Sequence, residues 1–212
     1  MVSKVMDFYL VTDCPKDQEY LDILCTSFRE TIQAVSNCDG DVQLRAHLLF
    51  CRKTPVLYSD VRPGDQILSP QGEARCHFGG ALQLLRKHLS ENDASSGYCP
   101  VIAFSSNRFP DDDIVEELYL LRQSSLYQEA TIIGMTSDEN SPAKMLMKLL
   151  CKYDEAIITG KNLGLFPRLF RIKEKERKTV PVAVDLTDPG DISALTGDLP
   201  EQDFLSAEEE MW

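Results

Sequence analysis

Two carboxylates near the start of the chain, Asp13 and Asp17, stand where a divalent cation or a polar ligand could bind. Residues 8–11 before them form an apolar, aromatic and β-branched run that predicts a buried strand. Pro15 has no N–H to donate, so this strand should end ahead of it. Because ligands bind beyond the carboxyl ends of strands in an open α/β sheet, both aspartates are predicted to line a site there. A loop aspartate and a helix N-cap are the simpler interpretation of the same two residues.

Two later segments place polar side chains at similar positions. Cys76 and His77 stand just ahead of a helical pattern whose start carries paired glycines, which let the backbone approach either an anion or the sheet closely. The continuous apolar run 100–104 predicts a further buried strand. It ends in a polar stretch whose candidate binding residues are Ser106, Arg108, Phe109 and Asp111. All three segments should therefore meet at one edge of the sheet.

The elements that must position these residues follow from hydrophobic periodicity. Apolar residues recur every three or four positions over 21–35, which predicts an amphipathic helix. Over 42–50 they alternate instead, which predicts a strand with Arg45 and His47 facing solvent. A short polar break leads to a second apolar run at 55–58, so these two strands should form an antiparallel hairpin. Pro55 places the second strand of the hairpin at an edge.

Buried strands are also predicted at 131–135 and 156–159. A helical pattern precedes each of them. The first follows three aspartates at 111–113, and the second begins at Ser141-Pro142, an N-cap followed by proline. A final helix is predicted near 163–170. Connections of this length allow crossover helices, so the predicted fold class is α/β: a doubly wound, Rossmann-like, mostly parallel sheet with one antiparallel edge strand.

The acidity of the chain is concentrated at its end. Nine acidic residues follow the last basic residue, Lys178, so the first 178 residues carry only −3 of the formal net charge of −12. This predicts an α/β domain at 1–178 and an acidic C-terminal tail at 179–212, which should pack on its own domain or fold onto a partner. The negative charge argues against a nucleic-acid or anionic membrane partner.

The seven cysteines form no C-x-x-C pair, so neither a zinc site nor a redox dithiol is predicted. Free buried thiols fit a reducing compartment. Asp7 interrupts the first apolar run, which excludes a signal-peptide core there, and no apolar run is long enough to span a bilayer. We therefore expect a soluble, cytoplasmic protein with no membrane partner.

The three polar segments, in this order and with the early edge hairpin, resemble a von Willebrand factor A (VWA) domain over residues 6–159. The family's first motif, Asp-x-Ser-x-Ser, reads Asp13-Cys14-Pro15-Lys16-Asp17 here. Cys76 stands at the position of its Thr ligand, ahead of Gly79-Gly80-Ala81-Leu82, which matches the Gly-x-Ala-Leu helix start. The third motif, Ser-Asp-Gly-x-Pro-Thr-Asp, reads Ser105-Ser106-Asn107-Arg108-Phe109-Pro110-Asp111, with Ser106 at the metal-associated Asp position.

The resemblance implies a degenerate metal-ion-dependent adhesion site. A magnesium site is built from hard oxygen ligands. Here Cys76 provides sulfur, Ser106 lacks the charge of an aspartate, and Pro15 lacks a hydroxyl group. Asp17 could restore one carboxylate, which leaves Asp13 and Asp17 as the metal candidates. No cofactor and no tight magnesium binding are expected.

The function implied by the resemblance is that of a non-catalytic protein–protein interaction module. Among VWA domains the chain looks closest to bacterial tellurium-resistance proteins, which implies an adaptor or scaffold in a stress or defence system beside a kinase or a phosphatase. The binding surface would be the top-face loops, with nearby acids steering a basic partner. Its residues would be Asp13, Asp17, Cys76, His77, Ser106, Arg108, Phe109 and Asp111.

The alternative function is a doubly wound, hydrolase-like enzyme that uses Asp13 with Cys76 or His77. Adjacent Cys and His side chains tend to diverge, and the sequence has no nucleophile elbow, P-loop or dinucleotide fingerprint. An enzyme is therefore not expected. The sequence leaves the partner, the pathway and the oligomeric state open.

Overall fold

The computed structural model describes residues 4–13, 18–38, 42–62, 64–65, 76–92, 97–151 and 156–160. All of them belong to one compact unit, which spans Met1–Lys175. The predictions for Asp17, for a helix near 163–170 and for the tail at 179–212 lie outside the described residues. No helix in the described ranges is long and apolar enough to cross a membrane.

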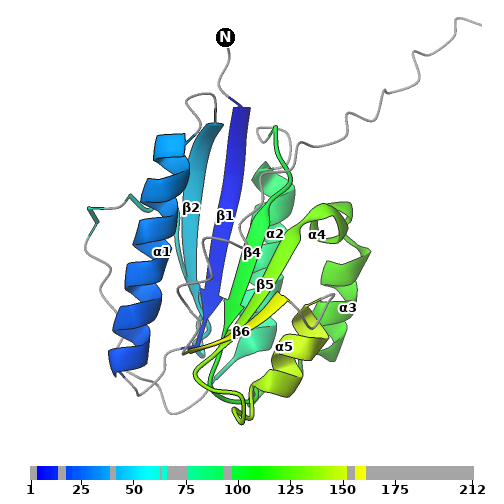
Figure 1. The fold of residues 1–212 in the computed structure, drawn as a ribbon. Helices are drawn as coiled ribbons and strands as arrows, with labels where there is room; N and C mark the ends of the chain where they lie inside the picture. The colour runs from blue at the N-terminus through cyan, green and yellow to red at the C-terminus, as the bar shows by residue number, and fades with distance from the viewer. Residues whose placement is uncertain are drawn as a thin grey trace, which may run out of the picture. The chain divides into compact units, whose positions relative to one another are not determined.

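Six strands and five helices follow one another along the described chain (Figure 1). They are β1 (Lys4–Thr12), α1 (Gln18–Cys38), β2 (Val42–Phe50), β3 (Val56–Tyr58), α2 (Phe78–Asn92), β4 (Val101–Ser105), α3 (Val115–Gln123), α4 (Ser125–Glu129), β5 (Thr131–Thr136), α5 (Lys144–Leu150) and β6 (Ile157–Thr159). The predicted order of strands and helices is confirmed across these residues, except that α4 was not predicted.

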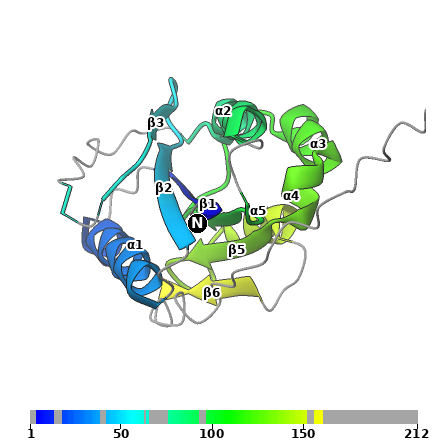
Figure 2. The same cartoon turned by 90° about the horizontal axis from the view of Figure 1, so that it is seen from above.

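The strands form one sheet in the order β3-β2-β1-β4-β5-β6. All neighbouring pairs are parallel except β2 with β3, which is antiparallel and leaves β3 at the edge. The predicted doubly wound, mostly parallel sheet with one antiparallel edge strand is therefore confirmed. Figure 2 shows α1 on one face of the sheet and α2, α3 and α4 on the other.

Helices cover both faces of the sheet. Its central strand, β1, alternates its side chains between the two cores that they form. Phe8 and Leu10 pack towards α1, where the rings of Phe8 and Phe28 lie 5.0 Å apart. Tyr9 and Val11 pack into the second core, under α2, α3, α4 and α5. A central parallel strand covered by helices on both sides fits the near-continuous apolar run of β1.

The prediction that Arg45 and His47 face solvent is wrong for His47, which is 2% exposed. Its ring stacks on Tyr9 and meets the ring of His88 on α2, so this helix covers the strand face. The buried Asp7 carboxylate accepts two hydrogen bonds from Arg45, of 2.8 and 2.9 Å, and lies 3.1 Å from His47 Nε2. Burial alone would raise the pKa of Asp7, but hydrogen bonds from His47 and Arg45 outweigh it and hold the pKa below its usual value.

The start of α2 is closed by a carboxylate of the chain itself. The backbone N–H groups of Phe78 and Gly79 donate to the two oxygens of Asp112, at 2.9 and 2.8 Å. Negative charge at a helix N-terminus is favourable, and these N–H groups have no partner inside the helix. A Cβ on Gly79 would lie 2.8 Å from both Asp112 Oδ2 and the Asp113 carbonyl oxygen. Gly79, the first of the paired glycines, therefore admits an intramolecular anion.

Replacing Gly79 should test this cap. We expect Gly79→Ala to destabilise the domain by about 1–3 kcal/mol, because the added methyl overlaps the capping carboxylate. Gly80→Ala is the matched control: its Cβ would lie 3.7 Å from Pro55, an ordinary contact. Alanine is favoured over glycine in a helix by roughly 0.5–1 kcal/mol, so this variant should be as stable as the parent or more so. Urea unfolding followed by circular dichroism measures both, and equal stabilities would contradict the cap.

Candidate functional site

The candidate site lies where β1 and β4 end, and it combines Asp13 with the β4–α3 loop (residues 106–114). Backbone hydrogen bonds fix the two strand ends: Asp13 N–H donates to the Ser105 carbonyl at 3.1 Å, and Ser106 N–H donates to the Met135 carbonyl at 3.2 Å. Asp13 and Ser106 are both fully buried. The structure thus brings together two of the residues predicted from the sequence.

One oxygen of the Asp13 carboxylate is surrounded by donors from three consecutive residues. Oδ2 lies 3.0 Å from Ser106 Oγ, 3.3 Å from Asn107 N and 3.5 Å from Arg108 Nε. The other oxygen, Oδ1, is buried and has no hydrogen-bond partner among the described residues. The β4–α3 loop is therefore wrapped around one half of a carboxylate that the sheet holds in place.

Burial raises the pKa of Asp13, although the Asn107 N–H, the Ser106 hydroxyl and the Arg108 charge act in the opposite direction. The ionised form therefore weakens the fold at neutral pH. A buried carboxylate that a fold keeps despite such a penalty marks a candidate functional position.

Arg108 links the buried Asp13 carboxylate to the protein surface. Its guanidinium lies on Asp13, yet 26% of its side chain is exposed. The Ser106 hydroxyl holds the adjacent backbone, since it lies 2.8 Å from the Arg108 carbonyl oxygen and accepts from the Arg108 N–H at 3.2 Å. Next to it, Phe109 is 45% exposed. The loop therefore presents a positioned cation beside an aromatic ring.

Cys76 and His77 lie beside this loop but do not share one partner. The Cys76 thiol is fully buried, and burial, with the Asp13 charge as a second cause, raises its pKa to about 12. It is therefore protonated at neutral pH, whereas a cysteine nucleophile must be a thiolate. His77 Nδ1 lies 3.9 Å from Asp112 Oδ2, and its Nε2 is buried with no hydrogen-bond partner in the part of the chain that the structure describes.

Asp111 links two backbone segments of the site. Its carboxylate accepts from the Cys76 N–H at 2.7 Å, and its own N–H donates to the Cys76 carbonyl at 2.8 Å. This double link joins the segment before α2 to the β4–α3 loop. Asp111 therefore positions the site through backbone contacts.

Two residues of the site were missed by the sequence analysis. Asn107 donates to Asp13 from its backbone and accepts from the Ser137 N–H through Oδ1 at 2.8 Å, which ties the loop to the end of β5. Tyr20 on α1 places its hydroxyl 3.0 Å from Ser105 Oγ. An Asn two residues after the end of a strand is a signal for such a turn contact. Tyr20 carries no comparable signal, because its helical period only marks it as core.

The donor set around Asp13 does not fit a magnesium ion. The Arg108 guanidinium already lies against the carboxylate and would repel a second cation, and the protonated sulfur of Cys76 is a poor ligand for a hard metal. In the described ranges no three His, Cys, Asp or Glu side chains gather as metal ligands. Asp17, the second predicted ligand, lies outside those ranges.

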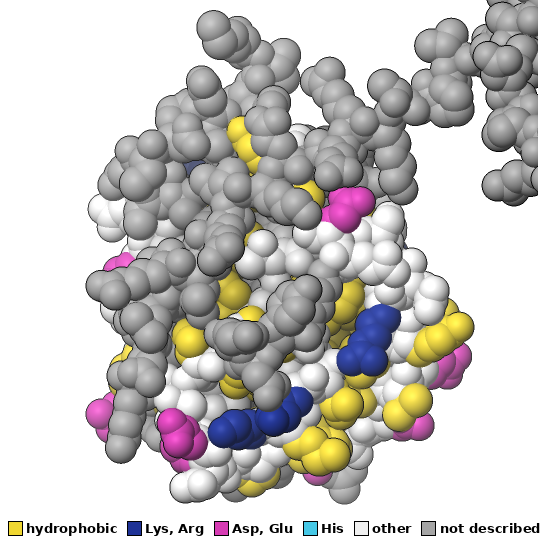
Figure 3. All heavy atoms as spheres, turned by 45° about the vertical axis from the view of Figure 1, so that its right-hand side comes forward, with side chains coloured by type: hydrophobic (Ala, Val, Ile, Leu, Met, Phe, Trp, Pro, Cys, Tyr) yellow, Lys and Arg dark blue, Asp and Glu magenta, His cyan; other side chains and the backbone are white. Residues whose placement is uncertain are grey.

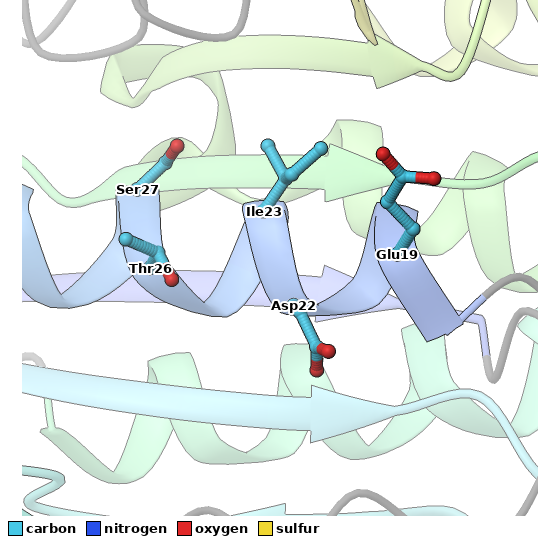
Figure 4. Close-up of a pocket in the computed structure, with 5 residues that line it drawn as sticks. All are labelled: Glu19, Asp22, Ile23, Thr26 and Ser27. Atoms are coloured by element: carbon cyan, nitrogen blue, oxygen red, sulfur yellow. The ribbon is translucent and has the colours of Figure 1, made fainter.

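A surface hollow of about 520 Å³ lies elsewhere, on α1. It is lined by Glu19, Asp22, Ile23, Thr26 and Ser27 (Figure 4). All five side chains come from one helix, so they do not converge from several elements as the groups of a specific ligand site do.

No protein-family model matches the sequence, and no curated protein matches it. Solved structures do match. Proximal thread matrix protein 1 from the mussel byssus superposes with a TM-score of 0.61 at 11% identity over 82% of this chain and 48% of its own. The ArnB paralog VWA2 from Sulfolobus acidocaldarius gives 0.55 at 11% identity over 79% and 44%. The pilus adhesin SpaC from Lactobacillus rhamnosus GG gives 0.57 at 9% over 78% and 29%.

The chain has a VWA-like fold. The match with the VWA2 protein and the strand order with its antiparallel edge agree on this point. The chain spans less than half the length of each of these three proteins, and the low identities carry the fold alone. The narrower resemblance to tellurium-resistance proteins stays a prediction.

The state of the Cys76 thiol can be tested by alkylation. Because burial raises its pKa to about 12, we expect iodoacetamide to label Cys76 in the VWA-like domain very slowly at neutral pH. Peptide mapping by mass spectrometry measures the rate, with the same peptide in urea as the reference. Labelling as fast in the folded protein as in urea would show that the thiol is accessible and ionised.

The pH dependence of stability tests the Asp13 carboxylate. Its raised pKa means that its stability contribution is greatest below the ordinary value of 3.8 and is lost as the pH rises through the folded-state pKa. We expect Asp13→Asn to melt at a higher temperature than the parent at pH 7. The difference in melting temperature should become smaller towards pH 4.

Asp7 provides a control of opposite sign. Its pKa is lowered, so its contribution is present above the ordinary pKa of 3.8 and is lost as the pH falls through the folded-state pKa. Asp7→Asn should therefore melt below the parent at pH 7, with the gap narrowing in acid. Calorimetry across this pH range measures both variants, and an Asp13→Asn variant less stable than the parent at pH 7 would refute the assignment.

Proposed function

We propose that this VWA-like domain is a non-catalytic protein-interaction module. It binds its partner through Arg108 and Phe109 of the β4–α3 loop, and it needs no metal ion. The observation that carries the proposal is the partly exposed Arg108 side chain, whose guanidinium lies on the fully buried Asp13 carboxylate. Binding involves no chemical reaction catalysed by the protein.

A guanidinium held in this way suits recognition of a carboxylate. Arg carries five N–H donors in a planar fork that matches the two oxygens of a carboxylate. Asp13 fixes one side of that fork from below, so the side chain loses less freedom when it binds a partner. In the family that the sequence resembles, a carboxylate of the partner completes the coordination of the metal ion. Here Arg108 would supply the positive charge instead.

Phe109 complements this cation. Aromatic and Arg side chains contribute most of the binding energy at many protein interfaces, especially where they lie side by side and lose water together. Phe109 directly follows Arg108 and is 45% exposed. The pair therefore fits a partner segment with an acidic group beside an apolar one.

The neighbouring acids have another role than the one expected from the sequence. Asp111, Asp112 and Asp113 each accept at least one backbone hydrogen bond, from Cys76, from Phe78 and Gly79, and from Val115. Their carboxylates are engaged in holding the loop and starting the helices. We therefore revise the partner from basic to acidic at the point where it meets Arg108.

The enzyme alternative required Cys76 or His77 to act with Asp13. The raised pKa of Cys76 and the contact of His77 with Asp112 support the non-catalytic proposal. The side chains of Cys25, Cys51, Cys76, Cys99 and Cys151 are buried as thiols, which supports a reducing compartment such as the cytoplasm. An adaptor or scaffold role in a bacterial stress or defence system, beside a kinase or phosphatase, is part of the proposal that rests on the sequence resemblance alone.

Site-specific crosslinking tests the proposal. The full chain would carry p-benzoylphenylalanine in place of Phe109, or in place of Tyr58 on β3 as the matched control, because the two rings are 45% and 41% exposed. We expect the Phe109 probe to capture a defined protein from the native host, with and without EDTA. The Tyr58 probe should not capture it.

Binding of the captured partner then measures the contribution of Arg108. Arg108→Ala should weaken binding by about 1–3 kcal/mol, roughly 5- to 150-fold in Kd. Arg86→Ala, which removes a guanidinium paired with Glu117 away from the loop, should leave Kd unchanged. Loss of binding in EDTA, or equal binding by Arg108→Ala and the parent, would overturn the proposal.

A further inference from the structure

Two histidines meet under α2, outside the candidate site. The rings of His47 on β2 and His88 on α2 have centroids 4.8 Å apart, and both contact the ring of Tyr9 on β1. Tyr9 and His47 are buried, whereas His88 is half-buried, and its Nε2 lies 3.4 Å from Ser59 Oγ, directly after β3. Histidine is the side chain whose ordinary pKa lies closest to neutral, so a cluster of this kind is suited to respond to mild acid.

The hydrogen bonds of His47 leave little room for a further positive charge in this cluster. The Asp7 carboxylate is ionised and can only accept, so His47 Nε2 carries a hydrogen and donates to it at 3.1 Å. Arg45 donates twice to the same carboxylate. His47 Nδ1 is buried and has no hydrogen-bond partner among the residues that the structure describes. Asp7 therefore has to balance Arg45 together with any charge on the two imidazoles.

The neighbours of His88 Nδ1 require the neutral ring. The Tyr9 hydroxyl lies 3.0 Å from Nδ1, and burial raises the pKa of Tyr9, so this hydroxyl keeps a hydrogen to donate. Asn92 Nδ2 lies 3.1 Å from the same nitrogen. It also donates to the His88 carbonyl at 2.9 Å, which orients the amide, and Nδ2 can only donate. Nδ1 is therefore an acceptor, and a proton placed on it would set two donors against each other.

The charges around His88 act on its pKa in both directions. The charged and titratable groups of the cluster come from β1, β2, α2 and the residues after β3, and they are Asp7, Tyr9, Arg45, His47, Asp60 and Glu91. Burial lowers the pKa of His88, and His47 and Arg45 act in the same direction. The carboxylates of Asp7 and Glu91 oppose this without outweighing it. Neutral His88 therefore stabilises the fold above its ordinary pKa of 6.5, and this stability is lost as the pH falls through the folded-state pKa.

We propose that His88 is a pH-sensitive switch for the last turn of α2. Neutral His88 holds this turn against β1 through Tyr9 and against Ser59 after β3, and its protonation in mild acid favours release of the turn. The start of α2 stays in place, because the Asp112 carboxylate caps it. Release therefore uncovers Tyr9 and His47 while the rest of the domain stays folded. Nothing in this proposal depends on the function proposed above.

Amide hydrogen exchange of the ¹⁵N-labelled full chain, followed by NMR at about pH 7 and about pH 5, tests the proposal. Leu89 of the same turn is buried, so the released state is a partial opening of the kind that exchange detects. With rates corrected for the intrinsic effect of pH, we expect the opening constant of the amides at 88–92 to rise several-fold in acid. The amides at 82–85 should not change. This local measurement separates the switch from Asp7 and Asp13, whose titration changes the stability of the whole domain.

Two matched variants identify the group that responds. His88→Gln removes the titrating ring but keeps an amide oxygen that can accept from Tyr9, so its α2 end should open equally at both pH values. His77→Gln removes a half-buried imidazole outside the cluster and should respond to acid like the parent. An α2 end that opens as much in acid in His88→Gln as in the parent overturns the proposal. So does a response that His77→Gln abolishes.

Titration of the ring resonances tests the state of His88 in the parent protein itself. The chain has three histidines, so the two variants assign their signals, the third by elimination. We expect His88 to titrate below the ordinary pKa of 6.5. Tyr9→Phe should raise the pKa of His88, because the neutral ring then loses a donor. A His88 that titrates at or above its ordinary pKa, or equally in Tyr9→Phe and the parent, overturns the proposal.

Discussion

The site depends on the Asp13 carboxylate at the end of the central strand. β1 pairs with β2 and β4 over most of its length, so Asp13 has little freedom to move. Its Oδ2 gathers donors from Ser106, Asn107 and Arg108. A loop of polar residues would otherwise sample many conformations, and ordering it loses entropy. The fixed carboxylate oxygen selects one of them and, through Arg108, carries the effect to the surface.

The other end of the loop is held by a different mechanism, which makes the arrangement rigid. Asp111 and Asp112 reach back to the backbone N–H groups before and at the start of α2. One half of the loop is thus anchored on a strand end, and the other half on a helix N-terminus. Binding groups placed on a loop of this kind stay in position without support from a ligand.

The fold could be predicted from the sequence because its signals are local. Buried parallel strands appear as short apolar runs, and Pro55 marks the edge strand. The site was predicted in part, since Asp13, Ser106 and Arg108 follow strand ends. Pairings between distant residues could not be predicted: Asp112 with the start of α2, Tyr20 with Ser105, and His47 with Asp7 and His88. His47 was misplaced because alternation alone cannot reveal that a helix covers the polar side of a strand.

The two edges of the sheet are its shortest strands. β3 and β6 have three residues each, and β3 follows a proline. An exposed strand edge can recruit further strands and lead to open-ended aggregation, and a short edge next to a proline offers few backbone groups for this. Lateral growth of the sheet from one molecule to the next is therefore disfavoured. The domain can therefore carry exposed apolar side chains on its helices (Figure 3) without forming extended sheets between molecules.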